Sequence, residues 1–176
     1  MTAAVFQSTI SINQAIGVPG DVYTNSPVIS QSWILNSASA AYNIIGATGY
    51  SSTTQGTAAA GGTLPFAGIL ANSKVYASNG DSSGALDPTL VLPNYAQGEL
   101  VTMGTMVITL PSGTVNIGDL IVMDNTTGAL SSIAPGAALP SGTSFAYATV
   151  VLYTIAAGSG LTIINLQPTL IIPQLA

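Results

Sequence analysis

Residues 99–110 read ELVTMGTMVITL, and in an extended strand this run places apolar side chains on both faces of the sheet. A strand that is apolar on both faces is buried between its neighbours, so we predict that this segment lies at the centre of the fold. Around it, 19 Gly and 10 Pro residues recur at short intervals and separate short runs rich in Val, Ile, Thr and Tyr. The pattern predicts an all-β fold, a β-barrel or a β-sandwich.

The C-terminal half carries clear strand and turn signals. Residues 124–128 read DNTTG, which is typical of a turn between two apolar runs. Residues 144–157 predict a long strand, and the GSG of residues 158–160 turns it into a second strand over residues 161–166, which makes a hairpin. One face of the long strand carries five large apolar side chains: Phe145, Tyr147, Val151, Tyr153 and Ile155.

The N-terminal half is less regular. Residues 5–12 and 27–35 alternate as strands do, and residues 38–45 favour a short helix because they include three alanines. Residues 51–63 hold Gly, Ala, Ser, Thr and one Gln but no core-forming side chain, and so predict a mobile loop.

These signals divide the chain into three regions. We predict an extended N-terminal arm over residues 1–45, and a loop-rich region with short strands over residues 46–92. A compact β-module with a C-terminal tail is expected over residues 93–176. The fold expectation is therefore one β-barrel or β-sandwich module with an extended arm and a loop-rich middle.

Charged residues make up 4% of the 176 residues, against about 25% in an ordinary domain. The sequence contains six acidic residues and one basic residue, Lys74, and it contains no Arg, His or Cys, so the net charge is −5. This composition excludes a Ser–His–Asp triad, a thiolate nucleophile and a zinc site of the usual ligands. One cation cannot neutralise several phosphates, so we expect no nucleic-acid partner. The apolar runs fall short of the roughly 18 residues of a membrane helix, so we expect no membrane partner either.

The low charge also favours a chain that works in an assembly. A free monomer usually keeps a surface that is about 25–35% charged. A surface of hydroxyl, amide and apolar groups costs less to desolvate than an ionic one, so it is more easily covered by a partner. We therefore expect a homo-oligomer, a dimer or trimer, with a monomer that has a hydroxyl-rich surface as the alternative.

Carboxylate pairs are the remaining candidates for chemistry. Asp81 with Asp87, and Asp119 with Asp124, could serve a hydrolase that uses two carboxylates. Asp beside Gly, Pro or Asn is typical of turns, and we interpret Asp81, Asp87 and Asp124 as turn caps. Lys74 could form a Schiff base if it were desolvated, but a solvated strand lysine is the simpler interpretation. We predict no catalytic residue, no metal site and no cofactor.

Five segments of the sequence form a set that is informative as a whole. They read GVPGDV at residues 17–22, PFAGILANSKVYA at 65–77, LDPTLVLPN at 86–94, VTMGTMV at 101–107 and IGDLIVMDNTTGAL at 117–130. In this order they resemble a known family, the structural cement proteins of tailed bacteriophage heads. The resemblance runs from about residue 17 to residue 166.

The resemblance implies a β-rich decoration protein that is not an enzyme. Such a protein would bind the major capsid protein on the outer surface of the virion, bridge its subunits and stabilise the shell, after residing in the host cytoplasm during assembly. As partner-binding residues we choose Val18, Tyr23 and Trp33, because they lie in the arm and because aromatic side chains dominate binding hot spots. The alternative function is a carbohydrate-binding or fibre-like β-sandwich module.

Overall fold

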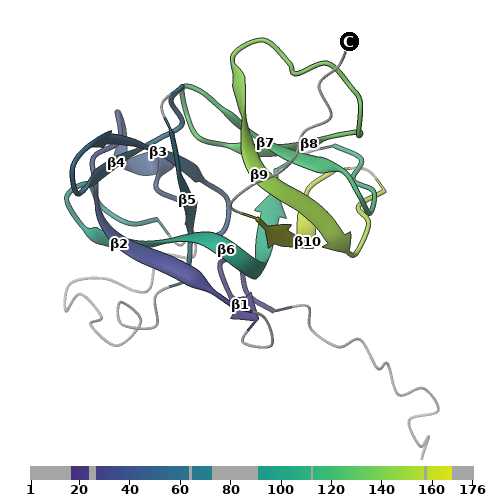
Figure 1. The fold of residues 1–176 in the computed structure, drawn as a ribbon, viewed down its shortest axis with the longest axis horizontal. Helices are drawn as coiled ribbons and strands as arrows, with labels where there is room; N and C mark the ends of the chain where they lie inside the picture. The colour runs from purple at the N-terminus through teal and green to yellow at the C-terminus, as the bar shows by residue number, and fades with distance from the viewer. Residues whose placement is uncertain are drawn as a thin grey trace, which may run out of the picture.

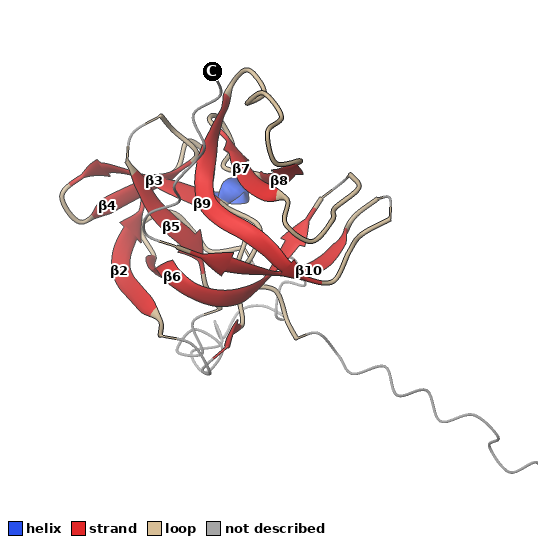
Figure 2. Ribbon diagram, turned by 45° about the vertical axis from the view of Figure 1, so that its right-hand side comes forward, coloured by secondary structure: helices blue, strands red, loops and turns tan. Residues whose placement is uncertain are grey.

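The computed structural model describes residues 17–23, 27–63, 65–72, 91–111, 113–156 and 158–167. Within these ranges the chain forms ten strands and one single-turn 3-10 helix, η1 (Ala40–Tyr42), and Figure 2 shows how little helix this part contains. The all-β prediction is confirmed. The strands, labelled in Figure 1, are β1 (Val22–Tyr23), β2 (Ile29–Leu35), β3 (Gly49–Thr54), β4 (Thr57–Ala60), β5 (Phe66–Leu70), β6 (Gln97–Leu110), β7 (Leu120–Asp124), β8 (Leu130–Ile133), β9 (Thr143–Leu152) and β10 (Gly160–Leu166).

Strand β6 is the centre of the sheet, as its sequence predicts. Its first half pairs antiparallel with β2 and with β5, and its second half pairs antiparallel with β1 and with β10. Gly104, with φ 129°, lies between the two halves, where a Cβ would come within 3.2 Å of the Val28 side chain and 3.3 Å of the Pro27 carbonyl oxygen. A glycine here lets β6 pass from one set of partners to the other while β2 approaches closely.

The strand order is β2-β4-β3-β5-β6-β10-β9-β7-β8, with β1 beside β6. Strand β8, at the end of this path, contacts β6 again, and part of the sheet closes into a five-stranded barrel. In Figure 1, β9 and β10 cross one half of the molecule, and β3, β4 and β5 form the other half. Of the two architectures that the sequence allows, the structure therefore has the barrel.

Two hydrophobic clusters lie beneath the strands. The larger one, which we call the barrel core, contains Met106, Ile108 and Leu110 of β6 together with residues of β7, β8, β9 and β10. The smaller one, the second core, contains Leu35 of β2, Tyr50 of β3 and Leu100 of β6 together with residues of β4 and β5. β6 contributes to both clusters: Leu100 belongs to the second core, and its neighbour Val101, which points to the opposite face of the strand, belongs to the barrel core.

One loop prediction is wrong. Residues 51–63 are not a mobile loop: Ser51 pairs with Ala59 and Ser52 with Ala58 in a hairpin of β3 and β4. Ala58 and Ala60 are buried in the second core. Where the strands lie close together, a methyl group is large enough to fill the space between them.

The face of β9 also differs from the expectation. The side chains that β9 buries are Ala146, Ala148 and Val150, whereas Tyr147 is exposed. Tyr147 has φ 49°, and the pairing of β9 with β7 shifts register between Ile121 and Val122, opposite this residue. The buried residues still alternate along β9, but they lie on the face opposite to the one that carries the large apolar side chains.

Other predicted elements have mixed outcomes. The strand over residues 27–35, the turn over 124–128 and the hairpin of β9 and β10 are confirmed, and the short helix is reduced to the single turn of η1. The predicted strand over residues 5–12 and the tail after Gln167 lie outside the described residues. In the described ranges, no helix has the length and apolar character of a transmembrane span.

Candidate interaction surface

The carboxylates of the described residues serve turns and strands. Asp124 ends β7, and its Oδ1 accepts hydrogen bonds from the Thr126 N–H at 2.9 Å, the Thr127 N–H at 2.7 Å and the Thr127 hydroxyl at 2.9 Å. The backbone hydrogen bond from Thr127 is the main cause that lowers the pKa of Asp124; the bonds from the Thr126 N–H and the Thr127 hydroxyl add to it, and partial burial opposes it. This geometry is that of a turn cap, as predicted.

The other described acids have similar partners. Asp119 is buried and accepts from the Asn116 N–H at 2.8 Å, and Asp21 accepts from the Val18 N–H at 3.1 Å, each within a tight turn. Glu99 accepts from the Ser30 hydroxyl at 2.6 Å across the pairing of β2 with β6. Asp81, Asp87 and Lys74 lie outside the described residues. In the described ranges, no three His, Cys, Asp or Glu side chains gather where they could hold a metal ion.

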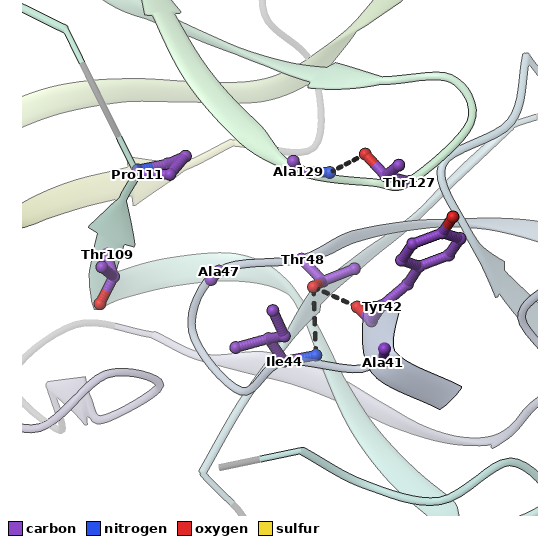
Figure 3. A pocket seen from close by; sticks show the side chains of 9 residues that line it. All are labelled: Ala41, Tyr42, Ile44, Ala47, Thr48, Thr109, Pro111, Thr127 and Ala129. Atoms are coloured by element: carbon purple, nitrogen blue, oxygen red, sulfur yellow. Dashed lines mark hydrogen bonds between the residues drawn. The ribbon is translucent and has the colours of Figure 1, made fainter. Parts of the chain in front are cut away.

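A small apolar pocket of about 130 Å³ lies between η1, the end of β6 and the turn after β7 (Figure 3). Ile44 and Pro111 contribute alkyl surface to it, while the Thr48 hydroxyl turns to the backbone, donating to the Tyr42 carbonyl oxygen at 2.6 Å. Among the described residues that line the pocket, Tyr42 carries the one ionisable group, and the lining is mostly apolar.

Exposed apolar side chains are concentrated on the segment that runs along β6 before η1. We call this the β1–β2 surface, and it comprises Val18, Tyr23, Val28, Ile29 and Ile34, which are all exposed by 36% or more. Tyr23 belongs to β1, Ile29 and Ile34 belong to β2, and Val18 and Val28 lie just before these two strands, which are labelled in Figure 1.

Strand β2 offers a free edge as well as apolar side chains. Ile29 to Ile34 pair with β6 on one edge, but β4 joins the other edge only at Ile34 and Leu35. For residues 29–33, no strand within the described ranges pairs with that outer edge. Unpaired strand edges with exposed apolar side chains are templates for further strands or for partner surfaces.

The three residues chosen from the sequence have different environments. Val18 is exposed in the turn that Asp21 caps, and Tyr23 is exposed at the end of β1. Trp33 is only partly exposed and packs against the second core, and its buried Nε1 has no hydrogen-bond partner within the described residues. Trp33 is thus not displayed as a planar platform of the kind a carbohydrate-binding module would use.

Sequence reasoning did not select Val28, Ile29 and Ile34. The alternating pattern of residues 27–35 predicts a strand with one buried face, and an edge position depends on partners that are distant in the sequence. The proline at residue 27, directly before β2, was the available signal, because proline is confined to strand ends and sheet edges.

A family model described as "Structural cement protein (E217 gp24/Pam3 gp6)" matches residues 6–167 of the sequence. The chain belongs to this family. Membership gives the chain a structural, non-enzymatic role in a phage particle, in agreement with the resemblance found in the sequence.

The fold has a counterpart among solved structures. A chain of the structure titled "The capsid of Myoviridae Phage XM1" superposes with a TM-score of 0.58 at 12% sequence identity, covering 95% of this chain and 100% of that chain. At this identity the likeness concerns the fold alone. No curated protein matches the sequence.

Proposed function

We propose that this protein is a capsid cement protein that binds the outside of the phage head, bridges subunits of the major capsid protein and stabilises the shell. The observation that supports this most is the family match over residues 6–167. The described surface is consistent with it, because five exposed apolar side chains and a free strand edge occur in one stretch of the chain, residues 18–34.

The chemistry of the β1–β2 surface suits a permanent contact. Its five side chains are uncharged, so desolvation on binding costs little and burial of apolar area is favourable, at about 25 cal/mol per Å². Contacts of this kind are insensitive to salt, whereas surface ion pairs are screened. Many copies bound over a symmetric shell would gain further by avidity.

The first part of the predicted N-terminal arm, residues 1–16, is proposed to extend this contact. Residues 1–16 precede the turn at Gly17, and their alternating run over residues 5–12 could add a strand to the sheet of the major capsid protein or of a sister subunit in a dimer or trimer. Val18 and Tyr23 would lie where the arm joins the barrel, and Trp33 would support β2 from beneath.

The experiment is an occupancy measurement on shells that lack the protein. Purified chain is added, free protein is removed by sedimentation, and bound copies are quantified. Ile29→Ser is expected to reduce occupancy, because it places a hydroxyl in an apolar contact. Ile117→Ser is the matched control, since Ile117 is an isoleucine of still higher exposure outside the β1–β2 surface.

Deletion of residues 1–16 tests the arm separately. This deletion leaves the turn from Gly17 to Asp21 intact, where the Gly20 N–H donates to the Val107 carbonyl oxygen at 2.9 Å. Reduced occupancy with an unchanged circular dichroism spectrum would support the arm. Wild-type occupancy for both the deletion and Ile29→Ser would refute the proposed binding surface.

A further inference from the structure

An aromatic groove lies where β5 faces β9, on the barrel side of the molecule. Two adjacent hollows of about 410 and 330 Å³ share the walls Pro65, Phe66 and Tyr147, and we call them together the aromatic groove. Phe145 and Leu139 line one hollow, and Gln167 lines the other. No charged residue is among the described residues that line either hollow.

The groove is built around a strained aromatic residue. The Phe66 and Tyr147 rings pack with centroids 5.8 Å apart at an angle of 48°, and Tyr147 remains 38% exposed. Its φ of 49° lies in the left-handed region, which non-glycine residues adopt at an energetic cost. Strain of this kind is concentrated at sites that hold a ligand or a partner segment.

The chain itself leads into this groove. The Gln167 N–H donates to the Tyr147 carbonyl oxygen at 3.0 Å, directly after β10 pairs Leu166 with Ala148 of β9. Because β10 and β9 are antiparallel, a chain that continues in this direction passes Phe145 and then Ser144, and both line the larger hollow.

The residues that follow Gln167 match the groove in chemistry. Residues 168–176 read PTLIIPQLA, with an apolar run over Leu170–Ile172 and no charged side chain. Pro168 and Pro173 fix φ near −65° and favour an extended backbone, which loses less entropy on binding than a flexible one. Extended proline-containing segments bind grooves lined by aromatic side chains.

We propose that residues 168–176 bind in the aromatic groove of their own chain, with Leu170–Ile172 packed against Phe66, Phe145 and Tyr147. Binding within one chain is favoured over exchange with a second copy, because the segment starts at the groove wall and a short tether gives an effective concentration in the millimolar range. The segment covers apolar surface that the barrel otherwise exposes at Tyr147 and Leu139. This inference does not depend on the capsid role.

Engineered disulfides test the proposal in the full-length protein. The natural sequence contains no Cys, so any disulfide in a double variant is the introduced one. Leu139→Cys is combined in turn with Leu170→Cys, Ile171→Cys and Ile172→Cys, because disulfide geometry is strict and one pair alone could be misaligned. The control combines Ile117→Cys with the same three tail positions, since Ile117 is exposed and lines neither hollow.

Crosslinking under mild oxidation is followed by non-reducing electrophoresis and mass spectrometry. At least one groove pair is expected to form an intramolecular disulfide about tenfold or more faster than its control. Adding Tyr147→Ser to that pair is expected to slow the reaction, with circular dichroism confirming the fold. Equal rates in all groove and control pairs would overturn the proposal, and so would crosslinked dimers, which would place the segment in the groove of another copy.

Discussion

The barrel core and the second core are stabilised by different means. The barrel core is made of long aliphatic side chains, such as Ile108, Leu110 and Ile121, that fill the space between strands by their volume. The second core combines large side chains, such as Leu35 and Leu70, with small ones, such as Ala58 and Ala60. It also contains an interaction of another kind, beside this apolar packing.

That other interaction is a buried hydrogen-bond network around Asn43. Its Oδ1 accepts from the Tyr50 hydroxyl at 3.0 Å and from the Ser37 hydroxyl at 2.6 Å. Its Nδ2 donates to the Leu92 carbonyl oxygen at 3.1 Å and to Asn94 Oδ1 at 2.9 Å. Burial raises the pKa of Tyr50, and the hydrogen bond to Asn43 satisfies its buried hydroxyl. The network joins three chain segments beside the second core.

The largest effect is expected from Ile108→Ala in the barrel core. Ile108 is fully buried, so truncation leaves a cavity and should lower the free energy of unfolding by about 2–5 kcal/mol. Denaturant unfolding measures this loss. Ile117→Ala, at an exposed isoleucine, should stay within about 0.5 kcal/mol of the wild type. Similar losses for both variants would show that the barrel core is not close-packed.

Asn43→Ala should lower the free energy of unfolding by about 2–4 kcal/mol, because it leaves the buried hydroxyls of Tyr50 and Ser37 without their acceptor. Tyr50→Phe is the matched control. It removes one hydroxyl and leaves Asn43 bonded to Ser37, so its loss should be clearly smaller. If Tyr50→Phe cost as much as Asn43→Ala, the single hydrogen bond between Tyr50 and Asn43, and not the wider network, would account for the stabilisation.

The turn over residues 124–128 joins the two regions and gives a third prediction. Gly128 has φ 73°, and a Cβ there would lie 2.5 Å from the Gly49 carbonyl oxygen of β3. Gly136 has a similar φ of 80° but open space around it. Gly128→Ala should therefore lower the free energy of unfolding by about 1–3 kcal/mol more than Gly136→Ala does. Because both glycines have a positive φ, the difference between the two losses reports the close approach of β3 and not the backbone strain. Equal losses would mean that β3 can move away from the turn.

How far the fold could be predicted follows from where each signal lies in the chain. The apolar run of β6, the hairpin of β9 and β10 and the turn at residues 124–128 are local patterns, and all three are confirmed. Strands β3 and β4 were missed because their alanines and serines become core residues only beside Leu35 and Leu70, which come from other strands. Local composition does not contain that information.

The candidate surface could be predicted only in part. Val18 and Tyr23 are exposed along β6, as a binding role requires, and the role itself stays a prediction. Ile29 and Ile34 were not selected, because exposure of β2 follows from pairings with residues 63 or more positions away. The bulge at Tyr147 was equally hidden, since nothing in the sequence near a tyrosine indicates a left-handed backbone.

The smallest effect is expected from Asp124→Asn, and it depends on pH. An amide oxygen can still accept from Thr126 and Thr127, but without the charge these hydrogen bonds weaken, and the loss at pH 7 should be about 1 kcal/mol. The pKa of Asp124 is lowered in the folded state, so its contribution is present above the unfolded value of about 3.9 and is lost as pH falls through the folded pKa. Urea unfolding at pH 7 and pH 2 should show that the wild-type advantage becomes smaller in acid. An equal advantage at both pH values would mean that the charge of Asp124 does not stabilise the turn at residues 124–128.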